Sequence, residues 1–261
     1  MDGTKIRISR TRDKAKTFLT IIALAGVFVF SSSYLKLDIG KFISRLANAG
    51  NVLNRMMNVD FSDIASVLSA MLSSVSIAVA ALFMGFLLSI ILSFLAASNI
   101  APSKILAGGI KGFVAVIRAV PALVWILMVV ASLGFGSTSG MIGIIFPTMG
   151  YLTKSFIASI EDLGYNTIEA MKTTGAGWLS IVTKGLLPGL ISPFSSWTAI
   201  RLEGNIAESI NLGMVGVAGI GSHLMKAIGK YNYGAITVII LVIFITMFII
   251  ENLTNKLKKS L

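Results

Sequence analysis

The sequence contains no cysteine and a single histidine, His223, among its 261 residues. The absence of cysteine excludes disulfides, thiol catalysis and thiolate metal sites. One histidine also argues against a histidine-built metal centre, because such centres combine several imidazole, thiolate or carboxylate ligands. We therefore expect no metal and no cofactor to be bound by this chain itself.

Charged residues are also scarce. They make up 13% of the chain, whereas a soluble domain carries about 25%. Hydrophobic residues make up 55%, and the mean hydropathy is +0.88. A bilayer core of about 30 Å needs about 20 apolar residues per helix, and several continuous apolar runs reach that length. This composition predicts an all-α integral membrane protein.

The sequence lacks the phosphate-binding pattern G-x-x-x-x-G-K-[ST], so we expect no nucleotide binding through such a loop. The segment GVAGIG (residues 216–221) resembles a dinucleotide fingerprint but has no strand–helix–strand setting. No nucleophile–base pair or metal-ligand cluster is recognisable, which argues against a membrane enzyme.

We predict six spans, at about residues 18–35, 64–97, 113–135, 140–160, 190–212 and 235–252. With the N-terminus in the cytoplasm, fifteen of the 22 lysines and arginines fall on the cytoplasmic side and six on the outer side. An excess of positive charge inside sets orientation during insertion. Both termini are therefore expected to be cytoplasmic, and the net charge of +11 is expected to meet membrane lipid rather than nucleic acid.

Three regions follow from this organisation. Residues 1–63 hold a basic N-terminus, a first helix that we expect to be retained rather than cleaved as a signal peptide, and an extracellular amphipathic segment. That segment reads equally well as an ordinary packed loop helix. Residues 64–252 form the transmembrane core, with a distinctive loop at 161–188, and residues 253–261 form a basic cytoplasmic tail.

The stretch EAMKTTGAGWLSIVTKGLLP lies between the fourth and fifth spans and is polar and rich in glycine. Asn166 or Thr167 can cap a short helix that Gly175 ends with a positive φ. A second short helix is expected at about residues 178–185, with Pro188 separating it from the next span. The pattern predicts two short helices anchored at both ends, although an ordinary connecting loop is the alternative.

This stretch resembles the EAA loop of ABC importer permeases. The five matching positions are Glu169, Ala170, Gly175, Leu187 and Pro188. The sequence departs from the family pattern at Met171, where alanine is usual, and at Gly185, where an apolar residue is usual. The resemblance implies a coupling helix that seats in a groove of a cytoplasmic ATPase.

Four further segments resemble phosphonate-type permeases: FLAASNIAPS (94–103), IRAVPALVWILM (117–128), RLEGN (201–205) and LGMVGVAGIG (212–221). The resemblance spans roughly residues 64–252. It implies a type I ABC importer core similar to the methionine permeases. It also implies a permease homodimer, two copies of an ATPase subunit that uses ATP and Mg, and an extracellular substrate-binding protein.

The fifth span is unusual because it contains three charged residues, Arg201, Glu203 and Glu208, together with Asn205. A charge at the bilayer centre costs about 2.5–3.5 kcal/mol on insertion scales, so these residues should face the protein interior. Arg201, Asn205 and Glu208 share one helical face, and Glu203 points elsewhere and can pair with another helix. The face is expected to line the translocation path, to form an internal ion-pair network, or to do both.

Four glycines, Gly213, Gly216, Gly219 and Gly221, follow this span and resemble a flexible outer gate. Close helix packing through small residues is the alternative.

The resemblance thus implies that the chain is the permease subunit of an ATP-driven importer in the cell membrane, for phosphonate or a related phosphorus oxyanion. Related permeases often carry a further arginine where this chain has Ala207, and Glu208 follows it, which favours a ligand with less negative charge. The alternatives are an ABC permease for another small solute and an ion-coupled secondary transporter.

Overall fold

The computed structural model describes residues 11–163 and 165–260. The helices, in chain order, are α1 (Thr11–Tyr34), α2 (Ile39–Met57), α3 (Ile64–Ala96), α4 (Lys104–Ala119), α5 (Ala122–Leu133), α6 (Ser137–Leu163), α7 (Tyr165–Thr173), α8 (Trp178–Ser180), the π-helical segment η1 (Ile181–Leu186), α9 (Leu187–Met214), α10 (Ile220–Gly229) and α11 (Tyr233–Ser260). The chain divides into two compact units, residues 1–54 and 55–261. Most of the basic N-terminus and the side chain of Asn166 lie outside the described residues.

The first unit contains α1 and most of α2. Residues 14–34 of α1 are apolar enough and long enough to cross a membrane, and none of that window is buried inside the protein. The amphipathic segment expected within residues 1–63 forms the helix α2, and its apolar residues Phe42, Leu46 and Leu53 are exposed. An amphipathic helix with an uncovered apolar face suits a membrane surface.

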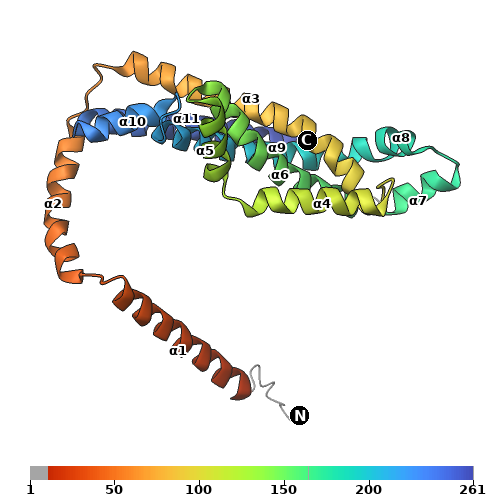
Figure 1. Ribbon diagram of the computed structural model, residues 1–261, viewed down its shortest axis with the longest axis horizontal. Coiled ribbons are helices and arrows are strands. Elements are labelled where there is room, and N and C mark those ends of the chain that lie inside the picture. The colour runs from red at the N-terminus through yellow and green to blue at the C-terminus, as the bar shows by residue number, and fades with distance from the viewer. Residues whose placement is uncertain (1–10, 164, 261) are drawn as a thin grey trace, which may run out of the picture. The chain divides into compact units, whose positions relative to one another are not determined.

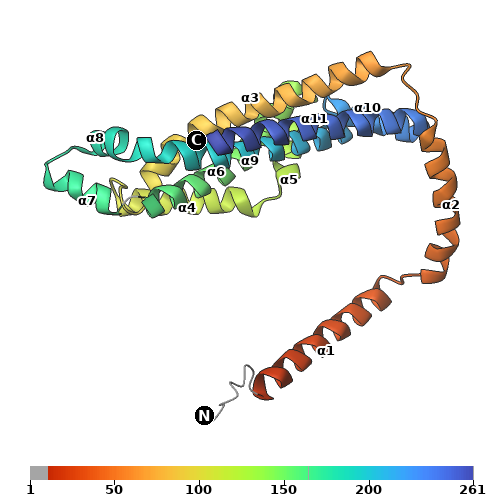
Figure 2. The same cartoon turned by 180° about the vertical axis from the view of Figure 1, so that it is seen from behind.

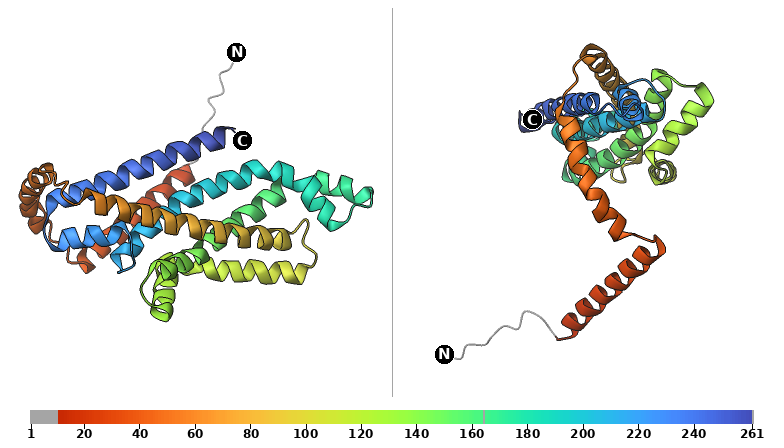
Figure 3. Two further views of the ribbon diagram at one scale, coloured as in Figure 1. Left: turned by 90° about the horizontal axis from the view of Figure 1, so that it is seen from above. Right: turned by 90° about the vertical axis from the view of Figure 1, so that its left-hand side faces the viewer.

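The second unit is a bundle in which α3, α6, α9 and α11 pack side by side (Figure 1). The view from behind shows α7 and α8 at one end of this bundle and α10 at the other (Figure 2). Seen from above, α11 runs beside α9 and α3 (Figure 3). The chain therefore passes along the bundle repeatedly, with the glycine-rich loop and the polar connecting stretch at opposite ends.

Among the described residues, four helices are long and apolar enough to span a membrane, or five if the α4–α5 pair counts as one span. The fifth predicted span, α9, has 28 residues but includes Arg201, Glu203 and Glu208. It is not among the helices counted above, although α3, α6 and α11 pack against it.

The prediction of one continuous third span at 113–135 is wrong. The helix begins earlier, at Lys104, and the axes of α4 and α5 meet at 89°. Val120 is extended, with φ −88° and ψ 126°, and Pro121 follows it. A proline disfavours the helical conformation of the residue before it and donates no backbone hydrogen bond, so the helix ends there.

Small residues bring α3 and α6 into close contact. A Cβ on Gly85 would lie 2.5 Å from Thr148 Cγ2. The hydroxyl of Ser89 lies 3.1 Å from the Met149 carbonyl oxygen and can donate across the same interface. This contact fixes Thr148 at the centre of the bundle, where it faces α9.

Candidate functional site

The first half of the polar stretch forms α7, and a Schellman motif ends this helix. Gly175 has φ +75°, and its N–H donates to the Lys172 carbonyl over 3.0 Å. The N–H of Ala176 donates to the Met171 carbonyl over 3.1 Å. This pair of bonds defines the motif, and its positive φ favours glycine. The predicted role of Gly175 as a helix terminator is confirmed.

The second half forms α8 and η1, as predicted, but Pro188 does not separate it from the next span. The backbone stays helical from Trp178 through η1 into α9. The N–H of Leu187 donates to the Val182 carbonyl, five residues back. Pro188 is the second residue of α9, which begins directly after η1. The π segment realigns the hydrogen bonds, so the loop connects rigidly to α9.

The stretch rests on a packed base. Ile168, Ile181 and Leu186 are buried in one cluster with Ile100 and Ile160. The indole N–H of Trp178 donates to the Ile100 carbonyl over 2.8 Å. These contacts tie both short helices to the turn between α3 and α4, so an ordinary mobile connection is disfavoured.

The same turn is held by Glu161, near the end of α6. Its Oε1 accepts from the backbone N–H of Ser98 over 2.8 Å and pairs with Lys111 Nζ at 2.9 Å. The Asn99 amide donates to the Ile160 carbonyl over 2.9 Å. A displacement of the loop would therefore be transmitted to α3, α4 and α6 together.

The predicted loop residues divide between two places. Glu169, Ala170 and Gly175 are exposed on the α7 half. Leu187 and Pro188 are exposed at the start of α9. We call the segment from α7 through α8, residues 165–180, the knob. The knob presents a carboxylate and a tight turn to a partner, and its buried side is held by the contacts with the α3–α4 turn and α6 described above.

The two departures from the EAA pattern compensate each other. A Cβ on Gly185 would collide with the sulfur of Met171. The methionine side chain therefore fills the space that an apolar residue at position 185 would occupy. Neither departure is a defect, because each makes room for the other.

We expect Gly185→Leu to destabilise the protein by about 1–3 kcal/mol, the usual cost of overpacking. The double variant Met171→Ala/Gly185→Leu, which restores the usual size order, should recover most of the loss. Thermal unfolding of the full chain in detergent measures both. A single variant as stable as the unmodified protein would contradict the compensation.

Two of the charged residues of α9, Arg201 and Glu208, belong to one network on one face of the helix. Arg201 Nη2 donates to both carboxylate oxygens of Glu208, at 2.9 and 2.8 Å, and the two side chains are 11% and 20% exposed. Arg201 Nε lies 3.3 Å from Thr148 Oγ1, to which it donates. The guanidinium also lies 5.8 Å from the centre of the Tyr151 ring. The predicted grouping of Arg201 and Glu208 is confirmed.

Asn205 completes this network and is fully buried. Its Oδ1 accepts from Thr148 Oγ1 over 2.8 Å, and its Nδ2 donates to the Ala78 carbonyl over 3.3 Å. The network thus links α9 to α6 and α3. Sequence reasoning missed Thr148 and Tyr151, which are three residues apart on α6 and are polar groups within an apolar span.

Glu203 points away from this network, as predicted. Its Oε1 accepts from Thr254 Oγ1 over 2.6 Å and lies 4.0 Å from Lys258 Nζ. Both partners belong to α11. Glu203 therefore connects α9 to the last helix rather than contributing to the Arg201 face.

The four glycines lie where α9 turns back into α10. A Cβ on Gly213 would lie 2.7 Å from Gly221 Cα, and a Cβ on Gly221 would collide with the Ile210 carbonyl. Gly216 and Gly219 have φ values of +94° and +140°. These contacts favour close helix packing at Gly213 and Gly221 and a glycine-specific turn between them.

Comparison with known proteins places this geometry in a family. Residues 89–259 match the family described as binding-protein-dependent transport system inner membrane component. The phosphite transport system permease protein PtxC of Stutzerimonas stutzeri is 26% identical over 90% of this chain and 86% of its own length. The phosphate-import permease protein PhnE of Mycolicibacterium smegmatis is 27% identical over 98% of this chain, which spans about half, 48%, of that relative.

Solved structures agree on the fold. A chain of the MetNI methionine ABC transporter, in an inward-facing conformation, superposes with a TM-score of 0.70 at 16% identity. The match covers 77% of this chain and 99% of the transporter chain. The predicted all-α fold of the methionine-permease kind is thus confirmed. This chain belongs to the family of binding-protein-dependent transport system inner membrane components, and it is a multi-pass membrane protein.

Proposed function

We propose that this chain is the permease subunit of an ATP-driven importer for a phosphonate or a related phosphorus oxyanion. The single observation that carries the proposal is the knob. Its surface residues Glu169, Ala170 and Gly175 are exposed, while its base is locked to three helices of the bundle. The relatives named for phosphite and phosphate transport support the substrate class.

The knob supplies a mechanism for coupling. A cytoplasmic ATPase subunit would receive it, with Glu169 offering a charge-assisted contact to a basic residue. We propose two copies of the permease and two of the ATPase, with both permease termini in the cytoplasm. When ATP draws the two ATPase subunits together, the two knobs would follow. Their rigid connections would then move α9 and the α3–α4 turn, which alternates access between two states.

The Arg201 network bears on the charge of the substrate. Arg201 is the natural group to attract an oxyanion in the path. Glu208 already compensates its charge at 2.8 Å. A dianion would therefore find little free positive charge on this face of α9. Phosphite, a phosphonate ester or a zwitterion fits this arrangement better.

The experiment is uptake into cells that carry this chain together with its ATPase and binding protein. The panel is phosphate, phosphite, methylphosphonate and 2-aminoethylphosphonate, with methionine as an unrelated control. We expect ATP-dependent uptake of one phosphorus oxyanion, lost when Glu169 is changed to lysine. Uptake that persists without the ATPase would instead support an ion-coupled secondary transporter, which has no need of the knob. Uptake of none of the four would overturn the substrate class.

A further inference from the structure

A cavity of about 330 Å³ is lined in part by α10, the helix that lies at the end of the bundle opposite α7 and α8 (Figure 1). It is formed by the start of α3, by α10 and by the start of α11. Its lining residues of interest are Asp60, Asp63, His223, Lys226, Lys230 and Asn232. None of them belongs to the knob or to the Arg201 network.

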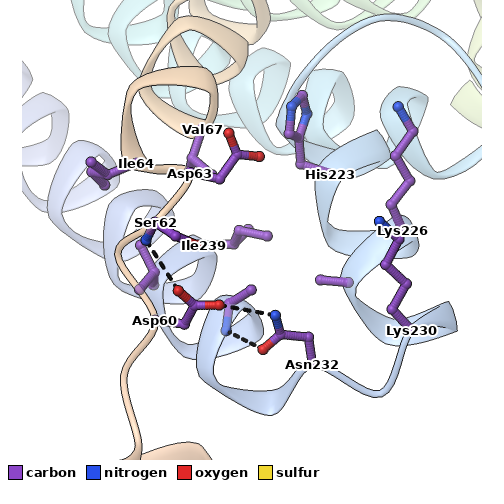
Figure 4. Close-up of a pocket in the computed structure, with 13 residues that line it drawn as sticks. Asp60, Ser62, Asp63, Ile64, Val67, His223, Lys226, Lys230, Asn232 and Ile239 are labelled. Carbon is purple, nitrogen blue, oxygen red and sulfur yellow. Dashed lines mark hydrogen bonds between the residues drawn. The ribbon is translucent and has the colours of Figure 1, made fainter.

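Charge is separated across this cavity. His223 and Lys226 on α10 and Lys230 at its C-cap follow one another at intervals of three and four residues, so they lie on one side of the helix. Asp60 and Asp63 precede α3 on the opposite wall. Figure 4 shows the two carboxylates on one side of the cavity and the three basic side chains on the other.

One of the carboxylates already has partners. Asp60 accepts from the Ser62 backbone N–H over 3.1 Å and from the Asn232 amide over 3.0 Å. Hydrogen bonding by the Ser62 side chain, then by the Asn232 amide and the Ser62 backbone N–H, lowers the pKa of Asp60 to about 2. Asp60 therefore stays ionised at neutral pH and holds the loop before α3 against the start of α11.

The other charged groups have no partner within the part of the chain that the structure describes. No ion pair involves Asp63, Lys226 or Lys230. Asp63 stands at the N-cap of α3 without a capping hydrogen bond from its side chain. The Nδ1 atom of His223 is buried and has no hydrogen-bond partner. A buried polar atom without a partner costs free energy that a bound ligand recovers.

We propose that this cavity binds a small zwitterion, with its oxyanion held by His223, Lys226 and Lys230 and its ammonium group held by Asp63. A simple anion would leave Asp63 facing added negative charge, and a simple cation would face two lysines. Val67, Val238 and Ile239 provide buried apolar wall for the carbon chain between the two charges.

The ligand chemistry is a phosphoryl or phosphonyl group that carries a nearby amine. A free aminoalkylphosphonate and the ethanolamine headgroup of a phospholipid both present it. The inference rests on the proposed function in one respect: the proposed orientation in the membrane places the opening of the cavity on the outer side. It agrees with the neutralised Arg201, since both sites favour a solute with little net charge.

The test is calorimetric binding to the purified full chain in nanodiscs of phosphatidylglycerol, whose headgroup has no amine. The probes are 2-aminoethylphosphonate, methylphosphonate, which lacks the ammonium group, and ethylamine, which lacks the oxyanion. We expect the zwitterion to bind about tenfold more tightly than either fragment, the effect of one charge-assisted contact. This binding measurement requires neither the ATPase nor transport. Its result therefore does not depend on the outcome of the uptake assay.

Variants identify the residues. Lys226→Gln/Lys230→Gln should weaken binding of 2-aminoethylphosphonate by about tenfold or more. Asp63→Asn should remove the preference for 2-aminoethylphosphonate over methylphosphonate. Lys104→Gln, an exposed lysine at the start of α4 and outside the cavity, serves as the matched control and should bind as the unmodified chain does.

A second set of nanodiscs containing phosphatidylethanolamine separates the two sources of the ligand. If that lipid co-purifies with the unmodified chain but not with the double lysine variant, and competes with 2-aminoethylphosphonate, the lipid headgroup is the occupant. Unchanged affinity in these nanodiscs assigns the cavity to the free solute. Equal binding of the three probes, or no binding and no retained lipid, overturns the proposal. Loss of binding-protein affinity in the lysine variants, without small-ligand binding, would overturn it in favour of protein docking.

Discussion

Replacing Gly175 with tryptophan is expected to abolish ATPase docking and to reduce coupled transport to background, while membrane insertion stays normal. The φ of +75° at this position is one that residues with a Cβ rarely adopt, and a bulky ring would also stand on the surface that the ATPase receives. Among the described residues other than Gly175 and its chain neighbours, no atom lies within 4 Å of the position that a Cβ would take, so the change should not disturb the bundle. Co-purification with the ATPase and ATP-dependent uptake measure the effect.

Two control variants separate backbone geometry from bulk. Gly175→Asn should retain most activity, because asparagine tolerates the left-handed conformation better than other residues with a side chain. Gly177→Ala lies two residues away, where φ is −70° and the space is equally open, and should behave as the unmodified protein does. Full coupling in the tryptophan variant would remove the knob from the coupling mechanism.

Local sequence signals predicted the knob well because its structure is set locally. Gly175 ends α7 by its own positive φ, and the helical spacing of Arg201 and Glu208 is enough to place them on one face. For Glu203, the sequence predicted a partner on another helix but could not identify which residue it is. Thr254 lies 51 residues further along the chain, and no local pattern connects the two.

Other features depend on packing between distant segments and were not predictable. Pro121 signals a helix end but not an angle, and the 89° bend is not specified by local sequence alone. In the sequence, Met171 and Gly185 are two separate departures from the family pattern. Only the structure shows that the two residues lie against each other and compensate in size. Gly213 and Gly221 resemble a hinge in the sequence, whereas in space each leaves room for the other's backbone.

The ion pair of α9 should show a large and distinctive pattern of stability and transport. Arg201→Met removes the partner of Glu208 and leaves a carboxylate that is 20% exposed without compensation. Breaking a buried pair in this way costs about 3–5 kcal/mol. We expect a loss at the lower end of this range because the Glu208 side chain is not fully buried. The double variant Arg201→Met/Glu208→Leu should recover most of that stability, since apolar replacement of both partners is often neutral. Thermal unfolding of the unmodified protein, of the single variants Arg201→Met and Glu208→Leu and of the double variant, all in detergent, gives the coupling free energy.

Transport by the double variant then separates the two roles of the pair. If Arg201 attracts the oxyanion in the path, the double variant should be stable but should transport no more than background. Transport at the unmodified level would show that the pair only holds the bundle together. Glu203→Gln is the matched control on the opposite face of α9, because the glutamine carbonyl can still accept from Thr254. We expect that variant to transport normally. A loss of uptake on changing Arg201 and Glu208 is then attributable to the face of α9 that carries them, where Arg201 lies beside Thr148 and Tyr151.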